Sequence, residues 1–386
     1  MIPAEFRDRL QTVRSHYRVA PWIVPREDEG PLLRSWQRCR EAGMREHECI
    51  NFEPVGRAQL AEIDERWQPL VQLARPETER LAAAVAGAGG AVLLFNPRGV
   101  IVDRLCHDGV LHPVLRVATR VGINVAERCV GTTAPAIALN DGLPYLVGRD
   151  AHFFANVRPF FCVAAPIDDP RGERLGALDL TWYDDQPAFD VLSLVADAAV
   201  AVENRMFRPE GDTVVVHFHP RAELVDTPLQ ALLSVDGEGR VSGANRAALR
   251  LLCQPRQALL GRPFAQLFDR RLGGLFGPVC GRGAAAGLVE MHSHSGMLVA
   301  ARFECALRGA PGPAGPSGLA GRAAELPAPR PAEADPVEAA SAGSMRELEL
   351  RAIDEALLAL GGNVSAAARR LGISRSTIYR RRQGLI

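Results

Sequence analysis

Residues 362–380 read GNVSAAARRLGISRSTIYR, and this stretch decides the architecture of the end of the chain. Its first half carries apolar residues at the spacing of one helix face, namely Val364, Ala367, Ala368 and Leu371. Gly372 follows, where a tight turn between two helices requires a residue without a Cβ atom. Ser374 can then cap a further helix that extends to about Gln383. The spacing therefore predicts a helix-turn-helix.

The residues around this stretch complete a small helical module. The apolar face of a preceding helix is marked by Leu350, Ile353, Leu357 and Leu360. Gly361-Gly362 ends that helix, and Asn363 is the predicted N-cap of the next one. In the last helix, Ile378 is predicted to face the core. We therefore expect residues 345–386 to form an all-α module.

The last helix also carries the chemistry expected of a DNA-binding surface. With Ile378 turned to the core, the residues expected to read base edges are Arg375, Ser376, Tyr379 and Arg380. The residues suited to phosphate oxygens are Ser374, Thr377, Arg381 and Arg382. No acidic residue follows Glu355, so this end of the chain is locally basic. The pattern predicts an interface for double-stranded DNA; the alternatives are a solvated basic tail and a helical pair that docks another protein.

Hydrophobic patterning predicts an α/β domain over residues 71–207. Short apolar runs joined by turn sequences indicate strand pairs at 91–95 with 100–105 and at 160–167 with 175–182. An amphipathic helix is predicted over 189–206. Residues 1–70 are expected to form a helical N-terminal region.

A second, smaller α/β domain is predicted over residues 222–308. Its expected strands lie at 231–235, 240–242, 287–294 and 297–307. Residues 309–344 are rich in Ala, Pro and Gly and have too few apolar side chains to offset the entropy of ordering, so we expect a flexible linker. The predicted fold class is thus α+β and multidomain, with two α/β domains before the all-α module.

Composition excludes several classes of function. The chain has 386 residues, a formal net charge of zero and no lysine, so it offers no lysine for a nucleotide phosphate or a Schiff base. Its eight cysteines are dispersed without a CxxC pair, and the His217-x-His219 and His292-x-His294 pairs lack further ligands. We expect no metal and no cofactor. With no signal peptide or membrane span expected, the predicted location is cytoplasmic, with no membrane partner.

The 362–380 stretch resembles the Fis-type helix-turn-helix that closes bacterial enhancer-binding regulators. In that family the module dimerises through its first helix. The resemblance therefore implies a homodimer on a palindromic site, with Leu350, Ile353 and Leu357 taking part in pairing.

The resemblance extends upstream to the acetoin-catabolism-regulator branch of these proteins. It rests on stretches 35–39, 130–134, 148–154, 164–167 and 175–180, which belong to a GAF domain in that branch. Residues 232–236 and 243–248 are similar to a PAS domain. The family normally has an AAA+ ATPase between sensor and DNA-binding module, whereas only the 309–344 linker stands there in this sequence. ATP-driven promoter opening is therefore not expected.

A small-molecule site is predicted in the GAF-like domain. The candidate ligand-binding residues are Cys129, Thr132, Thr133, His152, Phe153, Phe154 and Cys162. Ordinary core packing is the alternative for these aromatic and histidine side chains, and redox sensing is the alternative for Cys129 and Cys162. Thr133 stands where the family usually has Asn, and Pro135 interrupts the following run, so the pocket chemistry is expected to differ.

These features lead to one principal hypothesis and two rivals. The principal hypothesis is a ligand-sensing DNA-binding regulator that is not an enzyme, whose two states differ in DNA affinity or in contact with RNA polymerase. The first rival is a modulator that pairs with, or competes against, a full-length enhancer-binding paralogue. The second rival is an enzyme built on a sensor fold, although no catalytic set of residues rises above background.

Overall fold

A computed structural model describes residues 30–48, 50, 52, 54–106, 112–183, 189–270, 287–305, 345–360, 363–371 and 378. The described residues fall into two compact units. Each unit contains a five-stranded antiparallel sheet, and the C-terminal residues are helical. The predicted α+β class is confirmed. No described helix is both long enough and apolar enough to cross a membrane.

The first sheet has the strand order β2-β1-β5-β4-β3. Its strands are β1 (Ala91–Phe95), β2 (Ile101–Leu105), β3 (Tyr145–Gly148), β4 (Phe160–Asp168) and β5 (Arg174–Tyr183). The two predicted strand pairs are confirmed, as β1 with β2 and as β4 and β5 in the same sheet. The register of β1 and β5 places Leu93 opposite Asp179, which brings a carboxyl into the centre of the sheet.

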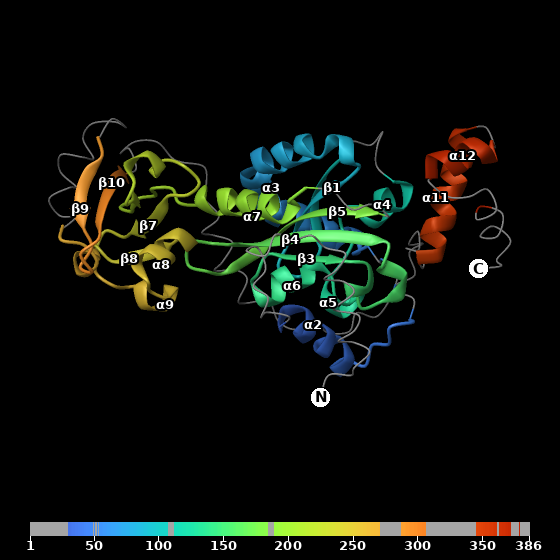
Figure 1. The fold of residues 1–386 in the computed structure, drawn as a ribbon, viewed down its shortest axis with the longest axis horizontal. Coiled ribbons are helices and arrows are strands. Elements are labelled where there is room, and N and C mark those ends of the chain that lie inside the picture. The colour runs from blue at the N-terminus through green and yellow to red at the C-terminus, as the bar shows by residue number, and fades with distance from the viewer. Residues whose placement is uncertain are drawn as a thin grey trace. The chain divides into compact units, whose positions relative to one another are not determined.

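Helices cover both faces of this sheet (Figure 1). On one face lie α3 (Arg57–Ala84) and α7 (Val191–Asn204), the latter confirming the helix predicted over 189–206. The other helices are α2 (Gly30–Glu41), α4 (Pro113–Ala118), α5 (Glu127–Val130) and α6 (Ala134–Asp141). Short 3-10 turns lie at Ala86–Ala88, Arg149–Ala151 and Ala155–Val157. Pro135 lies in the first turn of α6, where a missing N–H is tolerated.

The three central strands of the first sheet, β1, β4 and β5, are buried on both faces, so their residues do not alternate between apolar and polar. β5 is buried from Leu175 to Trp182. Leu93 and Phe95 of β1 belong to the same core cluster as residues of α2, α4 and α6. Asp179 and Thr181 of β5 lie on this side of the sheet, because they line one cavity together with Leu93.

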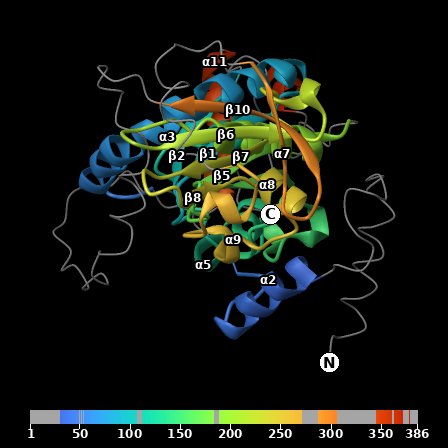
Figure 2. The same ribbon diagram turned by 90° about the vertical axis from the view of Figure 1, so that its left-hand side faces the viewer.

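The second sheet has the order β8-β7-β6-β10-β9. Its strands are β6 (Val214–His219), β7 (Ala231–Val235), β8 (Val241–Ala244), β9 (Val289–His292) and β10 (Leu298–Cys305). Two helices, α8 (Arg246–Leu252) and α9 (Arg256–Leu259), and the 3-10 turns Ala222–Leu224 and Phe264–Gln266 complete this unit (Figure 2). The predicted range 222–308 contains four of these strands, and the central strand β6 precedes it.

The core of the second unit is filled by aromatic side chains. Phe264 and Phe268 have ring centroids 5.0 Å apart, and Phe218 lies 5.3 Å from Phe268. All three rings are at most 1% exposed. Asn245 caps α8, because its side-chain oxygen accepts a hydrogen bond from the backbone N–H of Ala248 at 2.9 Å.

The C-terminal module contributes α11 (Met345–Ala359) and α12 (Val364–Leu371). Asn363 caps α12 as predicted, since its Oδ1 accepts a hydrogen bond from the backbone N–H of Ala366 at 3.1 Å. The residues predicted to form the internal face are buried in one cluster that contains Ile353, Leu357, Ala367, Ala368, Leu371 and Ile378. The pairing role implied for Ile353 and Leu357 conflicts with this burial, because both side chains are used in the core of their own module. On α11, Leu358 is an apolar side chain that is exposed, at 86%.

Candidate functional site

A cavity lies inside the first unit, between the sheet and the segments that follow β2, α4 and α5. The space between its lining atoms, with the part open to solvent, is about 460 Å³. Most of the lining is apolar, and the lining residues from the strands are Leu93, Phe95, Ile101, Phe160, Cys162, Asp179 and Thr181. The other lining residues are Phe52, Ala118, Thr119, Val125, Val130, Thr133, Pro135, His152 and Val157. A mostly apolar lining that includes a few polar side chains is typical of a site for a small organic molecule.

Asp179 is the acidic group of the cavity, and its side chain is fully buried. The hydroxyl of Thr181 donates a hydrogen bond to Asp179 Oδ2 at 2.5 Å, whereas Oδ1 has no hydrogen-bond partner among the described residues. Burial raises the pKa of Asp179 to about 8, against the lowering effect of the Thr181 bond, because a carboxylate loses its hydration in the interior. At neutral pH the group is therefore mostly a neutral carboxylic acid, and its proton belongs on the oxygen that Thr181 does not occupy.

His152 is the basic group of the cavity and is also fully buried. Burial lowers its pKa to about 4, and the nearby charge of Arg158 lowers it further. Its Nδ1 lies 3.3 Å from the carbonyl oxygen of Arg149, and no described residue forms a hydrogen bond with its Nε2. Only an N–H can donate to a carbonyl, so the neutral ring carries its proton on Nδ1 and offers Nε2 as an acceptor.

Cys162 supplies a thiol to the same cavity. Burial, and to a lesser degree the charge of Asp179, raises the pKa of this thiol well above its usual value. A thiol that stays protonated is a poor nucleophile and is oxidised slowly. The geometry therefore favours a packing role over the redox role considered as an alternative.

The cavity brings together only part of the predicted ligand set. Thr133, His152 and Cys162 line it, and the Thr133 hydroxyl also caps α6 by accepting from the Ala136 N–H at 3.2 Å. Phe153 and Phe154 instead pack in the core, with ring centroids 5.2 Å apart. The remaining candidates, Cys129 and Thr132, are not among the lining residues.

Asp179 and Thr181 are the polar cavity residues that the sequence prediction missed. The signal for them is local: Asp179 is the one charged residue within the apolar run 175–182. An acidic residue inside a strand that is buried on both faces is costly unless it has a partner or a role. Such an interruption therefore marks a candidate functional position.

Helix α2 is anchored on the outer side of the cavity wall. Thr132, next to the lining residue Thr133, accepts a hydrogen bond from the Ser35 hydroxyl at 2.8 Å. Trp36 Nε1 donates to the carbonyl of Ala151, the neighbour of His152, at 2.9 Å. These contacts connect α2 to residues adjacent in sequence to those that line the cavity.

Arg38 adds an ionic anchor to the same helix. Its guanidinium contacts Glu127 at 2.6 Å and Asp141 at 3.2 Å. The hydrogen bond with Glu127 is the largest cause that raises the pKa of Arg38. Both carboxyl groups are 10% exposed, so this pair is better shielded from solvent than an ordinary surface ion pair.

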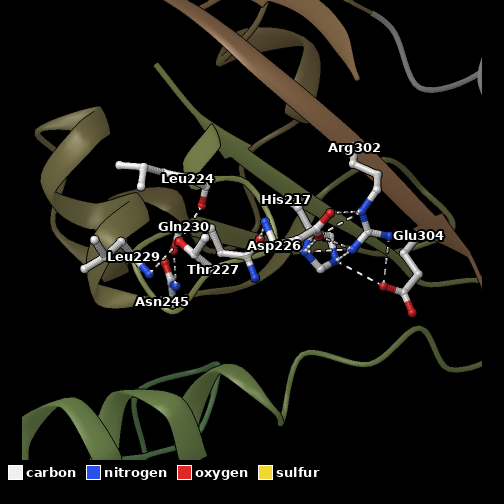
Figure 3. A network of polar contacts seen from close by, with 9 residues as sticks. All are labelled: His217, Leu224, Asp226, Thr227, Leu229, Gln230, Asn245, Arg302 and Glu304. Carbon is white, nitrogen blue, oxygen red and sulfur yellow. Dashed lines mark hydrogen bonds and ion pairs between the residues drawn. The ribbon is translucent and has the colours of Figure 1, made fainter. Parts of the chain in front are cut away.

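A polar network on the second sheet involves one histidine of the predicted pairs (Figure 3). His217 Nδ1 lies 3.0 Å from Gln230 Oε1, and His217 Nε2 lies 3.1 Å from Glu304 Oε2. Arg302 binds Asp226 through two nitrogens at 2.5 and 2.9 Å. The hydrogen bond from His217 is the main reason why the pKa of Glu304 is lowered. Within the described ranges, no group of three or more His, Cys, Asp and Glu residues is placed to hold a metal ion.

The predicted DNA-contacting residues lie outside the described residues. They are Ser374, Arg375, Ser376, Thr377, Tyr379, Arg380, Arg381 and Arg382. Of the predicted last helix the structure describes Ile378, which is fully buried against α11 and α12 as expected. Ile378 thus belongs to the core of the module.

Comparison with known families assigns both ends of the chain. A model described as the N-terminal domain of MimR matches residues 9–204, just over half of the 386 residues. The chain belongs to the MimR family. A second model, described as bacterial regulatory protein of the Fis family, matches residues 344–384. The predicted Fis-type helix-turn-helix is thereby confirmed for this MimR-family chain.

Regulators are among the relatives of this MimR-family chain. The acetoin catabolism regulatory protein of Cupriavidus necator is 30% identical over 289 residues, which cover 72% of this chain and 43% of that protein. The regulatory protein of the PTS-dependent dihydroxyacetone kinase operon of Escherichia coli is 23% identical over 61% of this chain and 37% of its own length. The chain thus spans less than half the length of these relatives.

A solved structure also matches part of the chain. The E. coli complex of DhaR(N) with DhaL contains a chain that is 16% identical, with a TM-score of 0.42. The match covers 72% of this chain and 99% of that chain.

Proposed function

We propose that this protein is a sequence-specific DNA-binding transcriptional regulator that senses a small ligand through the cavity of its first unit. The observation that carries the sensing role is a pair of buried polar atoms without partners, Asp179 Oδ1 and His152 Nε2, in one mostly apolar cavity. Buried polar atoms are nearly always hydrogen-bonded, so such a pair favours a ligand that completes both bonds. The Fis-family module and the relatives that regulate operons support the regulatory role.

The proposed DNA contacts are those of a recognition helix in the major groove. Arg375, Ser376, Tyr379 and Arg380 read base edges, while the phosphate contacts come from Ser374, Thr377, Arg381 and Arg382. The protein acts as a homodimer on a palindromic site, because a module of this size is marginal alone. Ligand binding shifts the dimer between states that differ in DNA affinity or in contact with RNA polymerase.

The proposed regulator acts without hydrolysing ATP. The 386 residues contain no lysine, and the P-loop of an AAA+ ATPase uses a lysine on the nucleotide phosphates. This observation favours control by binding, recruitment or occlusion.

Footprinting of the DNA upstream of the gene, with the purified full chain, tests the DNA-binding role. The double variant Arg375→Ala, Arg380→Ala should weaken binding by about a hundredfold, since each lost bidentate contact removes roughly 1–3 kcal/mol. Arg221→Ala is the matched control, because Arg221 is exposed on the second unit. Equal footprints for the double variant and the control would contradict the proposed DNA contacts. Protection that requires a longer relative would favour the alternative function, a modulator that pairs with or competes against a full-length paralogue.

A cavity-filling variant tests the sensing role separately. Ala118 lines the cavity from α4 and is 3% exposed, so Ala118→Leu reduces the space available to a ligand. Transcription from the target promoter should then lose its response to growth conditions, while the footprint on DNA remains. A variant that folds, binds DNA and responds normally would argue against the cavity as the sensing site.

A further inference from the structure

We propose that the ligand of the first unit is a small uncharged molecule that carries both a hydrogen-bond donor and an acceptor, held between the carboxylic acid of Asp179 and Nε2 of His152. This inference rests on the proposed sensing function and adds the chemical class of the ligand and the role of each polar residue. It depends on three features of the cavity: the state of its polar groups, the direction of their free hydrogen bonds and the position of the nearest charges.

The polar groups of the cavity are uncharged near neutral pH. Burial raises the pKa of Asp179 to about 8 and lowers the pKa of His152 to about 4. The thiol of Cys162 is also neutral, because burial raises its pKa. The hydroxyls of Thr133 and Thr181 are already engaged, with Ala136 and Asp179 respectively. A ligand therefore meets no fixed charge on the cavity wall.

The free hydrogen-bonding positions are complementary to each other. Asp179 Oδ2 is occupied by the Thr181 hydroxyl, so the proton of the acid lies on Oδ1 and is available for donation. His152 Nδ1 is occupied by the Arg149 carbonyl, so Nε2 is available as an acceptor. A molecule with one acceptor and one donor, such as a hydroxyl paired with a carbonyl or an amide, satisfies both atoms at once.

The surroundings disfavour an anionic ligand. Arginine is absent from the described lining residues, and the sequence contains no lysine. Arg158 is a cation whose charge reaches the cavity, because it lowers the pKa of His152. Its guanidinium is paired with Glu46 at 3.6 Å and with Asp150 at 3.5 Å. A carboxylate or phosphate would lose its hydration in this cavity without gaining an opposite charge.

A cationic ligand would need the ionised form of Asp179. Such a pair would bury two charges among the apolar side chains of Leu93, Phe95 and Phe160. The desolvation of both ions commonly offsets their mutual attraction, so a neutral hydrogen-bonded complex is favoured. The same apolar side chains are suited to a short aliphatic skeleton.

The test uses three probes of nearly equal size: propanamide, propanoate and propylammonium. Binding of each to the full chain is measured by titration calorimetry at pH 7. Propanamide should bind at least about tenfold more tightly than either charged probe, since a misplaced charge or an unmatched buried group is worth at least that factor. Tighter binding of propanoate or propylammonium, or no binding of propanamide at tens of millimolar, would overturn the proposal.

Two substitutions assign the residue roles. Asp179→Asn keeps a neutral donor in the same shape, so propanamide should bind within about threefold of the wild type. His152→Phe removes the acceptor and should weaken propanamide binding at least about tenfold.

Asp197→Asn is the control, because Asp197 is exposed on α7. If Asp179→Asn abolishes propanamide binding, Asp179 acts as an acceptor in its ionised form, and the proposed donor role is wrong. If His152→Phe fails to fold, His152→Gln replaces it and should retain binding through its amide oxygen.

The two levels of inference fail in different ways. If Ala118→Leu removes the transcriptional response but a charged probe binds best, only the ligand class is wrong. If Ala118→Leu leaves the response unchanged, the sensing function itself is wrong, whichever probe binds.

Discussion

Asp179 shows how burial changes the chemistry of one residue. In water its carboxyl would be ionised at neutral pH, whereas in β5 its pKa is raised to about 8. The same carboxyl is held by one hydrogen bond from Thr181. A buried acid of this kind destabilises the folded state at high pH, and such groups are often retained for function.

Asp179→Asn should therefore alter the pH dependence of stability. Below about pH 4 the acid is protonated in both the folded and the unfolded state, so its protonation does not change stability with pH. Between about pH 4 and 8 only the unfolded state releases the proton, so wild-type stability falls with rising pH and levels off above pH 8. The free energy of unfolding of Asp179→Asn should lack this fall, which is on the order of 5 kcal/mol for the full shift.

Urea unfolding followed by tryptophan fluorescence measures this effect in the first unit, because Trp36, Trp67 and Trp182 all precede the second sheet. Asp197→Asn should keep the wild-type pH profile. Parallel pH profiles for wild type and Asp179→Asn would show that Asp179 is ionised in the folded protein.

Gly176 is a position where the backbone of one strand approaches another too closely for a side chain. A Cβ atom at Gly176 would lie 2.0 Å from the carbonyl oxygen of Phe95. Gly176→Ala should therefore destabilise the first unit by about 3 kcal/mol, measured as the shift in the urea midpoint. Gly87→Ala is the matched control, because nothing lies within 4 Å of its added Cβ atom, and it should shift the midpoint little. Similar midpoints for the two variants would refute the close approach of β5 to β1.

At the scale of elements, α2 and the cavity wall form one connected structure. Glu127 contacts Arg38, and Val130 at the end of the same short helix α5 lines the cavity. Gly131 then has a φ of 67°, and a Cβ atom there would lie 2.9 Å from the ring of Phe154. The chain thus turns sharply at Gly131, between Glu127, which contacts α2, and Thr133, which lines the cavity.

Arg38→Met should loosen α2 from this wall. The change removes the cation from two carboxyl groups that are only 10% exposed. We therefore expect the free energy of local unfolding of α2 to fall by about 2–3 kcal/mol. Backbone amides of residues 30–41 should exchange with deuterium roughly thirty- to a hundredfold faster. Arg45→Met is the control, because the Arg45 side chain is 85% exposed and its contact with Glu48 is 4.0 Å. Unchanged exchange in α2 would show that Trp36 and Ser35 hold the helix without the ion pair.

At the scale of the whole molecule, the Fis-family module has a core of its own. Ile353, Leu371 and Ile378 are each at most 3% exposed within it. The sheet of the first unit has a separate core, which includes residues of the cavity wall. Ligand binding and DNA binding are therefore expected to be separable by truncation.

Removal of residues 345–386 should abolish DNA binding and leave the sheet and the cavity of the first unit folded. The truncated chain should show no retardation of promoter DNA at concentrations where the full chain binds completely, because all proposed base and phosphate contacts are lost. Its tryptophan-detected urea midpoint should match that of the full chain. If the truncated protein still retarded promoter DNA, the proposed role of the C-terminal module would be wrong.

The sequence by itself determined the elements whose signals are local. The apolar spacing of Val364 to Leu371 predicted α12, and the cap at Asn363 followed from its position before that run. The paired apolar runs predicted strands in both sheets, because periodicity and turns are written in consecutive residues, but they did not predict β3 or β6. The tertiary structure decided the composition of the cavity. Asp179 and His152 lie on different elements, and only the tertiary fold brings both into the lining of one cavity. Their unusual protonation follows from the same burial, since desolvation depends on neighbours that are distant in the sequence.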